Sequence, residues 1–265
     1  MLNPLPFVFS PPDASLLYIG RYDPMLVALS VVLAIMASYA TLQVFQRVAT
    51  STSPPARHLW IGVGGMCMGA GIWSTHFIGM LAFSLPCATH YDSTSTLLSM
   101  IPGILSSMLA MTLCKRPNIS PARQFTVGAL LGAGIGTMHY SGMAAYQLDG
   151  AIRYNAKLFL LSILVAVILA TLGIWIKFRA ESWRGHSSAS AVVGAIVMGL
   201  AISGTHYTAM AATYFVHQSR LSAWSPELAP EFLAYIVMIC ASVIIASSPR
   251  RWGTQAGRAE KPRCS

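Results

Sequence analysis

The chain has 265 residues, of which 55% are hydrophobic and 9% are charged, and its mean hydropathy is +0.60. A globular protein of this composition would be insoluble in water, so the composition excludes a soluble protein and indicates a polytopic membrane protein whose first partner is the lipid bilayer. A basic inner face on anionic lipid accounts for the formal charge of +9, and no nucleic-acid partner is expected.

Seven charge-free apolar stretches predict seven membrane-spanning helices, because each is close to the ~20 residues that cross a bilayer as an α-helix. Short polar connections rich in Pro, Ser and Arg separate the stretches and leave no room for an additional soluble domain. In chain order the predicted helices comprise residues 24–46, 59–83, 97–114, 125–147, 158–176, 189–216 and 232–248.

The expected fold is an all-α integral-membrane bundle of seven transmembrane helices over residues 1–250, followed by a short basic cytoplasmic tail over residues 251–265. Thirteen of the 17 Lys and Arg residues fall on one side of this bundle, which places the N-terminus outside and the C-terminus inside. Residues 1–23 show no signal-peptide pattern and the five cysteines show no CxxC spacing, so neither a cleaved leader nor a disulfide framework is expected.

One short pattern occurs three times, each time around a histidine inside an apolar run. The histidines are His76, His139 and His206, spaced 63 and 67 residues apart. Every copy keeps Ile four residues before the histidine, an aromatic residue directly after it, a small residue three after it and Met four after it. The three copies are Gly71-Ile-Trp-Ser-Thr-His-Phe-Ile-Gly-Met-Leu-Ala82, Gly134-Ile-Gly-Thr-Met-His-Tyr-Ser-Gly-Met-Ala-Ala145 and Ala201-Ile-Ser-Gly-Thr-His-Tyr-Thr-Ala-Met-Ala-Ala212.

The repeat predicts one shared site, because the three helices that carry it run in parallel from inside to outside. Each histidine lies about 7 to 10 residues before the predicted outer helix end, roughly 10 to 15 Å below the outer interface. Three parallel internal repeats favour a pseudo-threefold bundle in which these helices line the centre. On a helical wheel the glycines seven residues before each histidine and the methionines four after it share its face, which predicts close helix packing and a methionine layer: Gly69, Gly132, Gly199, Met80, Met143 and Met210.

Ionisable side chains within a membrane indicate function, and three at one depth strengthen that interpretation. In the alternative interpretation each histidine only hydrogen-bonds a neighbouring carbonyl or hydroxyl group. The predicted metal ligands are His76, His139 and His206, with Met80, Met143 and Met210 as secondary ligands because methionine at helical spacing also fits simple packing. Imidazole and thioether donors suit copper, including Cu(I), whereas zinc and haem are the less favoured alternatives.

These residues resemble the MHYT domain, a bacterial integral-membrane sensor family named for a Met-His-Tyr-Thr motif repeated in three of its helices. The resemblance covers about residues 20–250. It implies six or seven helices in the bacterial cytoplasmic (inner) membrane, copper held by motif His and Met residues, and sensing of oxygen, carbon monoxide or nitric oxide. The leading Met of the motif is kept only at Met138, because Thr75 and Thr205 replace it in the other copies, so the trailing methionines inherit the thioether role.

Many MHYT proteins carry a cytoplasmic output domain, whereas this chain ends about 17 residues after the last predicted helix, so a separate cytoplasmic signalling partner is expected. The favoured function is a metal-dependent sensor of a diatomic gas or of redox state, and the alternatives are a copper carrier or transporter and a haem-binding or redox protein. All eight Asp and Glu lie in loops, tails or at a helix edge, which weakens active transport. No CxxCH motif or substrate signature supports catalysis. His90 and His217 are either guards of the outer entrance or solvated loop residues, and Trp73 is expected to pack against the site.

Overall fold

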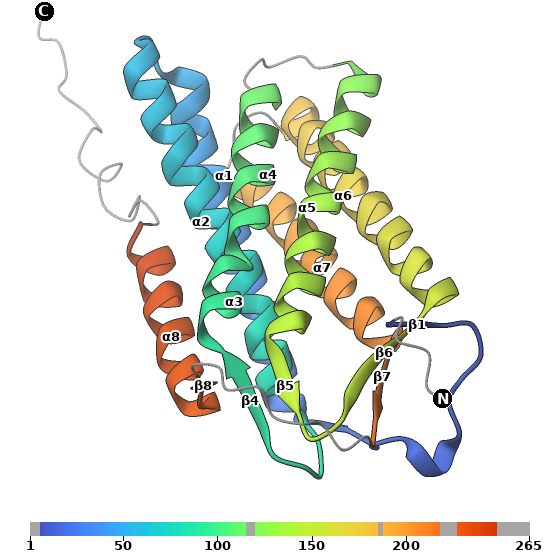
Figure 1. Ribbon diagram of the computed structural model, residues 1–265. Helices are drawn as coiled ribbons and strands as arrows, with labels where there is room; N and C mark the ends of the chain where they lie inside the picture. The colour runs from blue at the N-terminus through green and yellow to red at the C-terminus, as the bar shows by residue number, and fades with distance from the viewer. Residues whose placement is uncertain (1–5, 115–119, 185–187, 218–226, 248–265) are drawn as a thin grey trace, which may run out of the picture.

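The computed structural model describes residues 6–114, 120–184, 188–217 and 227–247, so the predicted tail at 251–265 lies outside the described residues. Within those ranges the chain forms eight α-helices (Figure 1), and helices lie at all seven predicted positions. The helices are α1 (Pro24–Thr50), α2 (Pro54–Leu81), α3 (Ser93–Leu98), α4 (Met100–Cys114), α5 (Pro121–Ala145), α6 (Ala156–Arg184), α7 (Ser188–Ala211) and α8 (Pro230–Ser247).

The helices form a bundle with approximate threefold symmetry. The three motif helices α2, α5 and α7 contact one another at the centre and run in the same direction (Figure 1). The outer helices fill the three grooves between them: α1 packs against α2 and α7, α4 against α2 and α5, and α6 against α5 and α7. Helix α8 packs outside this arrangement, against α1 and α2. The symmetry follows the order of the repeat, since each motif helix is preceded in the chain by an outer helix.

The motif glycines allow close packing, but against the outer helices rather than at the centre of the bundle. A Cβ atom added at Gly69 would lie 2.6 Å from the backbone nitrogen of Ile104 in α4, and one at Gly199 would lie 2.6 Å from that of Ile35 in α1. At Gly132 the added atom would lie 2.7 Å from Cα of Val167 in α6. Only a residue without a side chain permits backbones to approach this closely. The predicted close-packing role is therefore confirmed, and the structure identifies the outer helices as the partners.

Each motif helix ends in a short strand, and these strands form three small sheets that cover one end of the bundle, named here the sheet end (Figure 1). The sheets have the strand orders β1-β6-β7, β2-β3 and β5-β4-β8. The strands are β1 (Phe7–Val8), β2 (Arg21–Tyr22), β3 (Phe83–Ser84), β4 (Thr89–Asp92), β5 (Tyr146–Leu148), β6 (Ala151–Asn155), β7 (Thr213–Val216) and β8 (Glu227–Leu228).

The sheets correct the all-α prediction and the predicted ends of the motif helices. Residues 213–216 were predicted as helix and form β7, and Phe83 and Tyr146 likewise lie in strands. These strands are partly buried, with Tyr146 and Phe215 each 4% exposed, so apolar character continues beyond the helix ends and conceals the change of structure. The earlier ends also reduce the depth of the site, because each motif histidine lies five or six residues before its helix end instead of 7 to 10.

Polar residues fix where several helices start. The carboxylate of Asp23 accepts hydrogen bonds from the backbone of Met25 and Leu26 at the start of α1. Ser120 caps α5 by accepting from the backbone of Arg123, and Asn155 caps α6 in the same way. These side chains satisfy N–H groups that have no partner in the first helical turn. Because α1, α2 and α5 also have proline at the first helical position, their starts are readable from the sequence.

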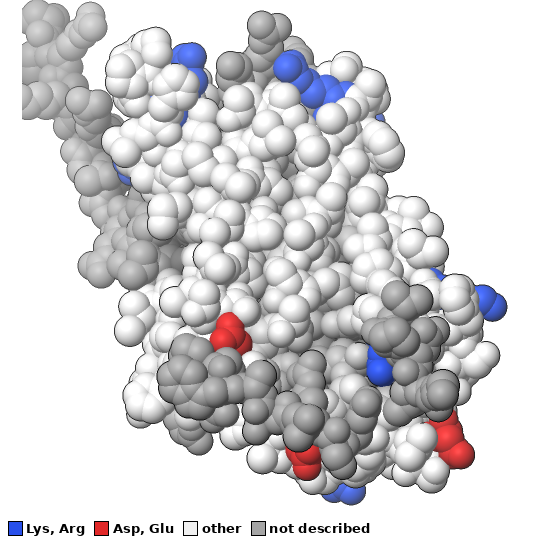
Figure 2. All heavy atoms as spheres, in the orientation of Figure 1, with Lys and Arg blue, Asp and Glu red and all other residues white. Residues whose placement is uncertain are grey.

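Four segments in the described part of the chain are long and apolar enough to cross a bilayer: Pro24–Thr50, Ser93–Cys114, Ala156–Ile176 and Ala189–Ala211. Three of them are the outer segments of the bundle, which would face lipid. The motif helices α2 and α5 are not among the four, because their Gly, Ser, Thr and His residues lower their mean hydropathy. The outer helices pack around them and separate them from lipid. On the face shown in Figure 2, charged side chains gather toward the two ends of the helices, and the belt between is uncharged over the described residues.

Candidate metal centre

The three motif histidines meet at the centre of the bundle. The Nδ1 atom of His76 lies 3.1 Å from Nδ1 of His139 and 3.1 Å from Nδ1 of His206, and the last two lie 3.3 Å apart. The side chains are between 0 and 4% exposed. They form a buried group whose ligand-type atoms all lie within 4.8 Å of one another. The structure thus brings together the three residues that the sequence singled out.

The small residue three positions after each histidine makes room for a neighbouring imidazole. A Cβ atom at Gly142 in α5 would lie 2.6 Å from Nε2 of His76, and one at Gly79 in α2 would overlap Nε2 of His206. The third copy has Ala209 at this position, with a side chain of one carbon atom. Helices α2 and α5 therefore each supply one histidine and a recess for the histidine of another helix, which links the spacing of the motif to the convergence of the rings.

Three neutral imidazoles cannot satisfy one another in this arrangement. Each ring has one N–H donor and one acceptor nitrogen, so three mutual Nδ1 contacts cannot all be hydrogen bonds. The opposite nitrogens, Nε2 of His76, His139 and His206, are buried without a hydrogen-bond partner among the described residues. Unpaired buried polar atoms cost ~1–3 kcal/mol each. A cation that accepts three Nδ1 lone pairs removes the conflict at the centre.

The size of the nitrogen triangle fits a metal ion. From the three Nδ1 separations, the equidistant point lies about 1.8 Å from each nitrogen, close to the ~2.0 Å between a metal and an imidazole nitrogen. A small outward movement of the rings would complete the match. A haem does not fit, because a porphyrin would have to separate two rings whose Nδ1 atoms are only 3.1–3.3 Å apart.

The motif hydroxyl groups do not act as partners of the histidines. Thr75 donates to the carbonyl of Gly71 and Thr205 to that of Ala201, each within its own helix. Ser141 and Thr208 likewise donate to carbonyls of their own helices. The Nδ1 atoms of the histidines contact only one another and the Nε2 atoms have no partner among the described residues, so the alternative interpretation, in which each histidine hydrogen-bonds a neighbouring carbonyl or hydroxyl group, has no support in this geometry.

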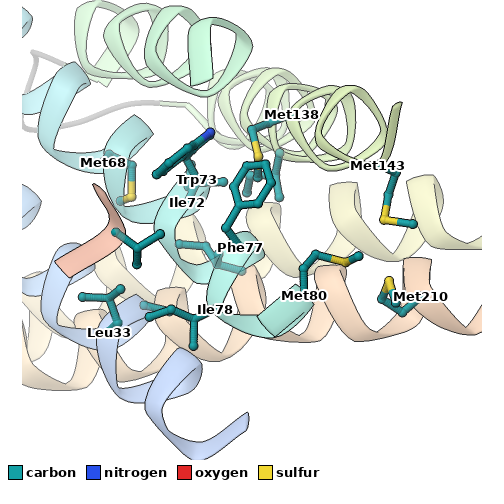
Figure 3. Close-up of a cluster of buried hydrophobic side chains, with 14 of the residues drawn as sticks. Leu33, Met68, Ile72, Trp73, Phe77, Ile78, Met80, Met138, Met143 and Met210 are labelled. Carbon is teal, nitrogen blue, oxygen red and sulfur yellow. The ribbon is translucent and has the colours of Figure 1, made fainter. Parts of the chain in front are cut away.

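The motif methionines lie on the sheet-end side of the histidines. Met80, Met143 and Met210 are 1%, 0% and 5% exposed and belong to one buried cluster. In Figure 3 the three side chains come from three helices and gather at one end of that cluster. Because each follows its histidine by one helical turn, a thioether layer adjoins the imidazole layer. The structure brings these three predicted residues together as well.

The motif isoleucines close the side of the histidines that faces away from the sheet end. Ile72, Ile135 and Ile202 precede the histidines by four residues and are 0%, 3% and 4% exposed. The cavity that they line together with their neighbours has a volume of only about 10 Å³, which is at the lower limit for one water molecule. The centre therefore lies between a methionine layer toward the sheet end and an apolar layer toward the other end.

A second set of contacts, which the sequence analysis missed, holds the aromatic residues of the motif in place. The hydroxyl of Tyr207 lies 2.9 Å from Oγ of Ser30 in α1, and that of Tyr140 lies 2.6 Å from Oγ of Ser162 in α6. In the first copy Phe77 has no hydroxyl, and Trp73 instead donates from Nε1 to Ser99, at 3.2 Å.

The three serines share one spacing, which becomes visible only with the fold. Each of the three serines precedes by five residues the outer-helix residue on which a motif glycine packs, as the pairs Ser30 with Ile35, Ser99 with Ile104 and Ser162 with Val167 show. Each serine is at most 2% exposed. The threefold repeat therefore includes the outer helices. Trp73 also donates to the carbonyl of Thr96, and its buried ring lies 4.7 Å from that of Phe77, which itself lies 4.7 Å from His76, so the expectation that Trp73 packs beside the site is confirmed.

The sheet end supplies an aromatic cover above the centre. The ring of Tyr91 in β4 lies 5.7 Å from that of Phe77 and 5.2 Å from that of Tyr146. Burial raises the pKa of Tyr91 well above its ordinary range and that of Tyr146 to about 12. Both phenols are neutral at physiological pH, so these two residues add no negative charge above the histidines.

The two other histidines considered as guards of an entrance lie in this cover. His90 is half-buried in β4, opposite Gln147 of β5. His217 is exposed after β7, and its ring lies 3.6 Å from that of Tyr18. No disulfide joins the four cysteines within the described ranges.

Comparison with known proteins gives a consistent family relationship. The family model described as MHYT, bacterial signalling protein N terminal repeat, matches residues 15–58, 69–127 and 132–190. His76 and His139 lie in the second and third matched ranges, and His206 lies beyond them. No solved structure matches the chain.

The relatives are longer bacterial signalling proteins. Bifunctional diguanylate cyclase/cyclic di-GMP phosphodiesterase MucR of Pseudomonas aeruginosa is 41% identical over 86% of this chain and 33% of its own length. Cyclic di-GMP phosphodiesterase NbdA of the same organism is 36% identical over 77% of this chain and 26% of its own length. Signaling protein YkoW of Bacillus subtilis is 32% identical over 73% of this chain and 24% of its own length. The chain thus spans a third or less of the length of these relatives.

Proposed function

The chain belongs to the MHYT family of bacterial signalling domains, and from that premise we propose that it is a membrane-embedded sensor built around a metal centre. The proposed ligands are His76, His139 and His206, with Met80, Met143 and Met210 as thioether ligands. The observation that carries the proposal is the convergence of three buried Nδ1 atoms within 3.1–3.3 Å of one another.

Copper is the metal that this set of donors favours. Imidazole nitrogens and thioether sulfurs are borderline-to-soft ligands. The Asp and Glu residues lie outside the three motifs, so no motif carboxylate is present to bind a hard cation. Cu(I) accepts low coordination numbers and thioethers, whereas zinc prefers four nitrogen, thiolate or oxygen ligands. Bound copper would supply an open coordination position for a diatomic gas, or a one-electron redox change. We assign oxygen, carbon monoxide, nitric oxide or redox state as the signal.

The membrane topology completes the proposal. Seven segments cross the bacterial cytoplasmic membrane, counting α3 and α4 as one, with the sheet end outside. The arginines at the opposite end of the described helices support this orientation, since Arg47, Arg57, Arg123 and Arg179 lie there. Residues 1–250 form the membrane domain and residues 251–265 a basic cytoplasmic tail. The metal centre then lies in the outer half of the bilayer.

The signal is read in the cytoplasm by a separate signalling partner, and the chain itself has no catalytic role. Support comes from the relatives, since two of those described above are named for cyclic di-GMP synthesis or hydrolysis, and this chain matches only a minor part of each. We therefore assign the output to cyclic di-GMP signalling.

A copper carrier is the competing function, and the isoleucine layer argues against it. A carrier needs a path from the centre to each side of the membrane, whereas Ile72, Ile135 and Ile202 are packed on the inner side with almost no free volume between them. The geometry of the rings argues against haem. A metal held between a closed apolar layer and a thioether layer suits a sensor.

Metal analysis of the purified protein tests the proposal. The wild type in detergent micelles is expected to retain about one copper per chain, and the variant His76→Ala/His139→Ala/His206→Ala none. Equal copper content in both proteins would contradict the proposed metal centre. Zinc in place of copper in the wild type would show that the centre holds zinc. Copper flux into proteoliposomes separates the two functions, because steady flux that requires the histidines would identify a carrier.

A further inference from the structure

A pocket of about 340 Å³ lies at the sheet end, between the end of α7 and the segment that precedes α1. We name it the outer pocket. Its walls are mainly aromatic, from Tyr18, Tyr22, Phe83, Tyr207 and Phe215, and Met210 lines it as well. The two-stranded antiparallel sheet of β2 and β3 forms one side, where Tyr22 pairs with Phe83. The pocket therefore connects a partly open surface of the protein with a predicted ligand of the metal centre.

The three motif methionines differ in their relation to this pocket. Met210 is 5% exposed and lines it, whereas Met80 and Met143 are 1% and 0% exposed and are not among its lining residues in the described part of the chain. Met210 follows His206 by four residues, so its thioether lies one helical turn from the imidazole layer on the same helix face. One of the three predicted thioether ligands is thus accessible from the surface, and the threefold symmetry of the site is broken there.

The lining of the outer pocket suits a soft cation. No Lys, Arg, Asp or Glu lines it among the described residues. Burial raises the pKa of Tyr22 to about 12, so this phenol is neutral at physiological pH. Aromatic faces attract cations, and the thioether of Met210 is a soft, polarizable ligand. A carboxylate in the lining would have favoured hard cations.

We propose that the outer pocket is the route by which Cu(I) enters the metal centre, with Met210 as the first ligand that it meets. The inference rests on the proposed metal centre and adds its direction of loading. The isoleucine layer closes the opposite side of the histidines, so the ion enters from the sheet end. Copper passes from Met210 to the histidines across one helical turn.

The test measures the rate of loading. Metal-free protein in lipid nanodiscs is mixed with a coloured Cu(I) chelator complex, and the loss of the colour reports transfer. The variant Ala211→Trp narrows the pocket, since Ala211 is an exposed residue of its lining. The control is Ala144→Trp, because Ala144 holds the same motif position in α5, is also exposed and does not line this pocket within the described residues.

We expect Ala211→Trp to slow Cu(I) uptake at least tenfold while the final copper content stays at the wild-type level, and Ala144→Trp to load as fast as the wild type. Equal rates for both variants and the wild type would overturn the entry route and leave the metal centre standing. Absence of uptake by the wild type would instead contradict the metal centre itself.

Cysteine labelling decides the matter where Ala211→Trp perturbs folding. The variants Met210→Cys and Met143→Cys are treated with a small neutral methanethiosulfonate, and modification of the relevant peptide is followed by mass spectrometry. We expect the cysteine at position 210 to react at least tenfold faster than that at position 143. Equal reactivity at the two positions would show that the pocket gives no access to the centre.

Discussion

At the scale of single residues, the site depends on two glycines without side chains as much as on the ligands. Gly79 and Gly142 leave space that the imidazoles of His206 and His76 fill. The convergence of these two rings therefore requires glycine at positions 79 and 142, because a Cβ atom at either position would meet an imidazole nitrogen. Ligand chemistry alone does not explain these glycines.

We predict that Gly142→Ala lowers copper affinity at least tenfold. The added Cβ would lie 2.6 Å from Nε2 of His76 and would push that ring out of the nitrogen triangle. The control is Gly62→Ala in the same bundle, where an added Cβ meets nothing within 4 Å. Affinity is measured by competition with a Cu(I) chelator. Wild-type affinity in Gly142→Ala would show that the recess does not position the histidine.

We predict that the combined variant Met80→Leu/Met143→Leu/Met210→Leu binds Cu(I) more weakly by a factor of ten or more, yet unfolds near the wild-type temperature. Exchanges of Leu for Met nearly conserve volume and usually cost less than about 1.5 kcal/mol each, so packing survives while the thioethers are lost. Chelator competition and thermal unfolding in detergent are the two measurements. Unchanged affinity would assign the methionines to packing alone.

The ligand candidates could be predicted from the sequence because the motif repeats with its histidines at equivalent helix positions. The serines at 30, 99 and 162 could not, because they lie outside the motif helices and only the fold shows that their hydroxyls meet aromatic side chains of those helices. The contact between Nδ1 atoms also needed the structure, since a helical wheel gives the face of a residue and not the orientation of its ring.

At the scale of helices and strands, the motif glycines hold each inner helix against one outer helix: α2 against α4, α5 against α6 and α7 against α1. We predict that Gly132→Ala destabilises the protein by ~1–3 kcal/mol, the usual cost of inserting a group into a packed interior. The added Cβ would lie 2.7 Å from backbone atoms of α6, which cannot move aside as a side chain can. Thermal unfolding is compared with that of Gly62→Ala, and equal midpoints would contradict the proposed close contact.

The cap of α3 predicts a dependence of stability on pH. Hydrogen bonds from the hydroxyl and backbone N–H of Ser95 lower the pKa of Asp92 below its ordinary value of 3.8. A lowered folded-state pKa stabilises the protein above the unfolded-state pKa, and that contribution is lost as the pH falls through the folded-state value.

We therefore expect the unfolding temperature of the wild type to fall more than that of Asp92→Asn between pH 5 and pH 3, since the asparagine cap does not titrate. Thermal unfolding of both proteins is measured across this range in the same detergent. Parallel decreases in the two proteins would show that Asp92 makes no such contribution.

Helices lie at all seven predicted positions, but their bounds differ from the prediction at both ends: α2 and α5 begin at Pro54 and Pro121, before the predicted 59 and 125, and α7 ends at Ala211, before the predicted 216. Starts carry Asp, Asn or Ser with or without Pro, which have a defined capping role. The ends pass into buried strands such as β7, whose apolar residues continue the hydrophobic run, so length and composition alone cannot locate the change. The strand pairings, as between β4 and β5, join distant segments and have no local signal.

At the scale of the whole molecule, the bundle is layered along its pseudo-threefold axis. From the sheet end the order is aromatic cover, methionines, histidines and isoleucines, with the outer helices filling the grooves between α2, α5 and α7. The repeat predicted the arrangement of the inner helices. It did not predict the three sheets or the outer pocket, because those come from loops that differ among the copies. The asymmetry at Met210 originates there.

X-ray absorption spectroscopy at the copper edge of the copper-loaded protein tests the central claim most directly, namely that three imidazoles hold one metal ion. The account predicts histidine nitrogen neighbours at ~2.0 Å from copper, together with sulfur scattering that disappears in the triple Met-to-Leu variant. A copper environment without imidazole scattering, or the same spectrum from the triple His-to-Ala variant, would contradict it.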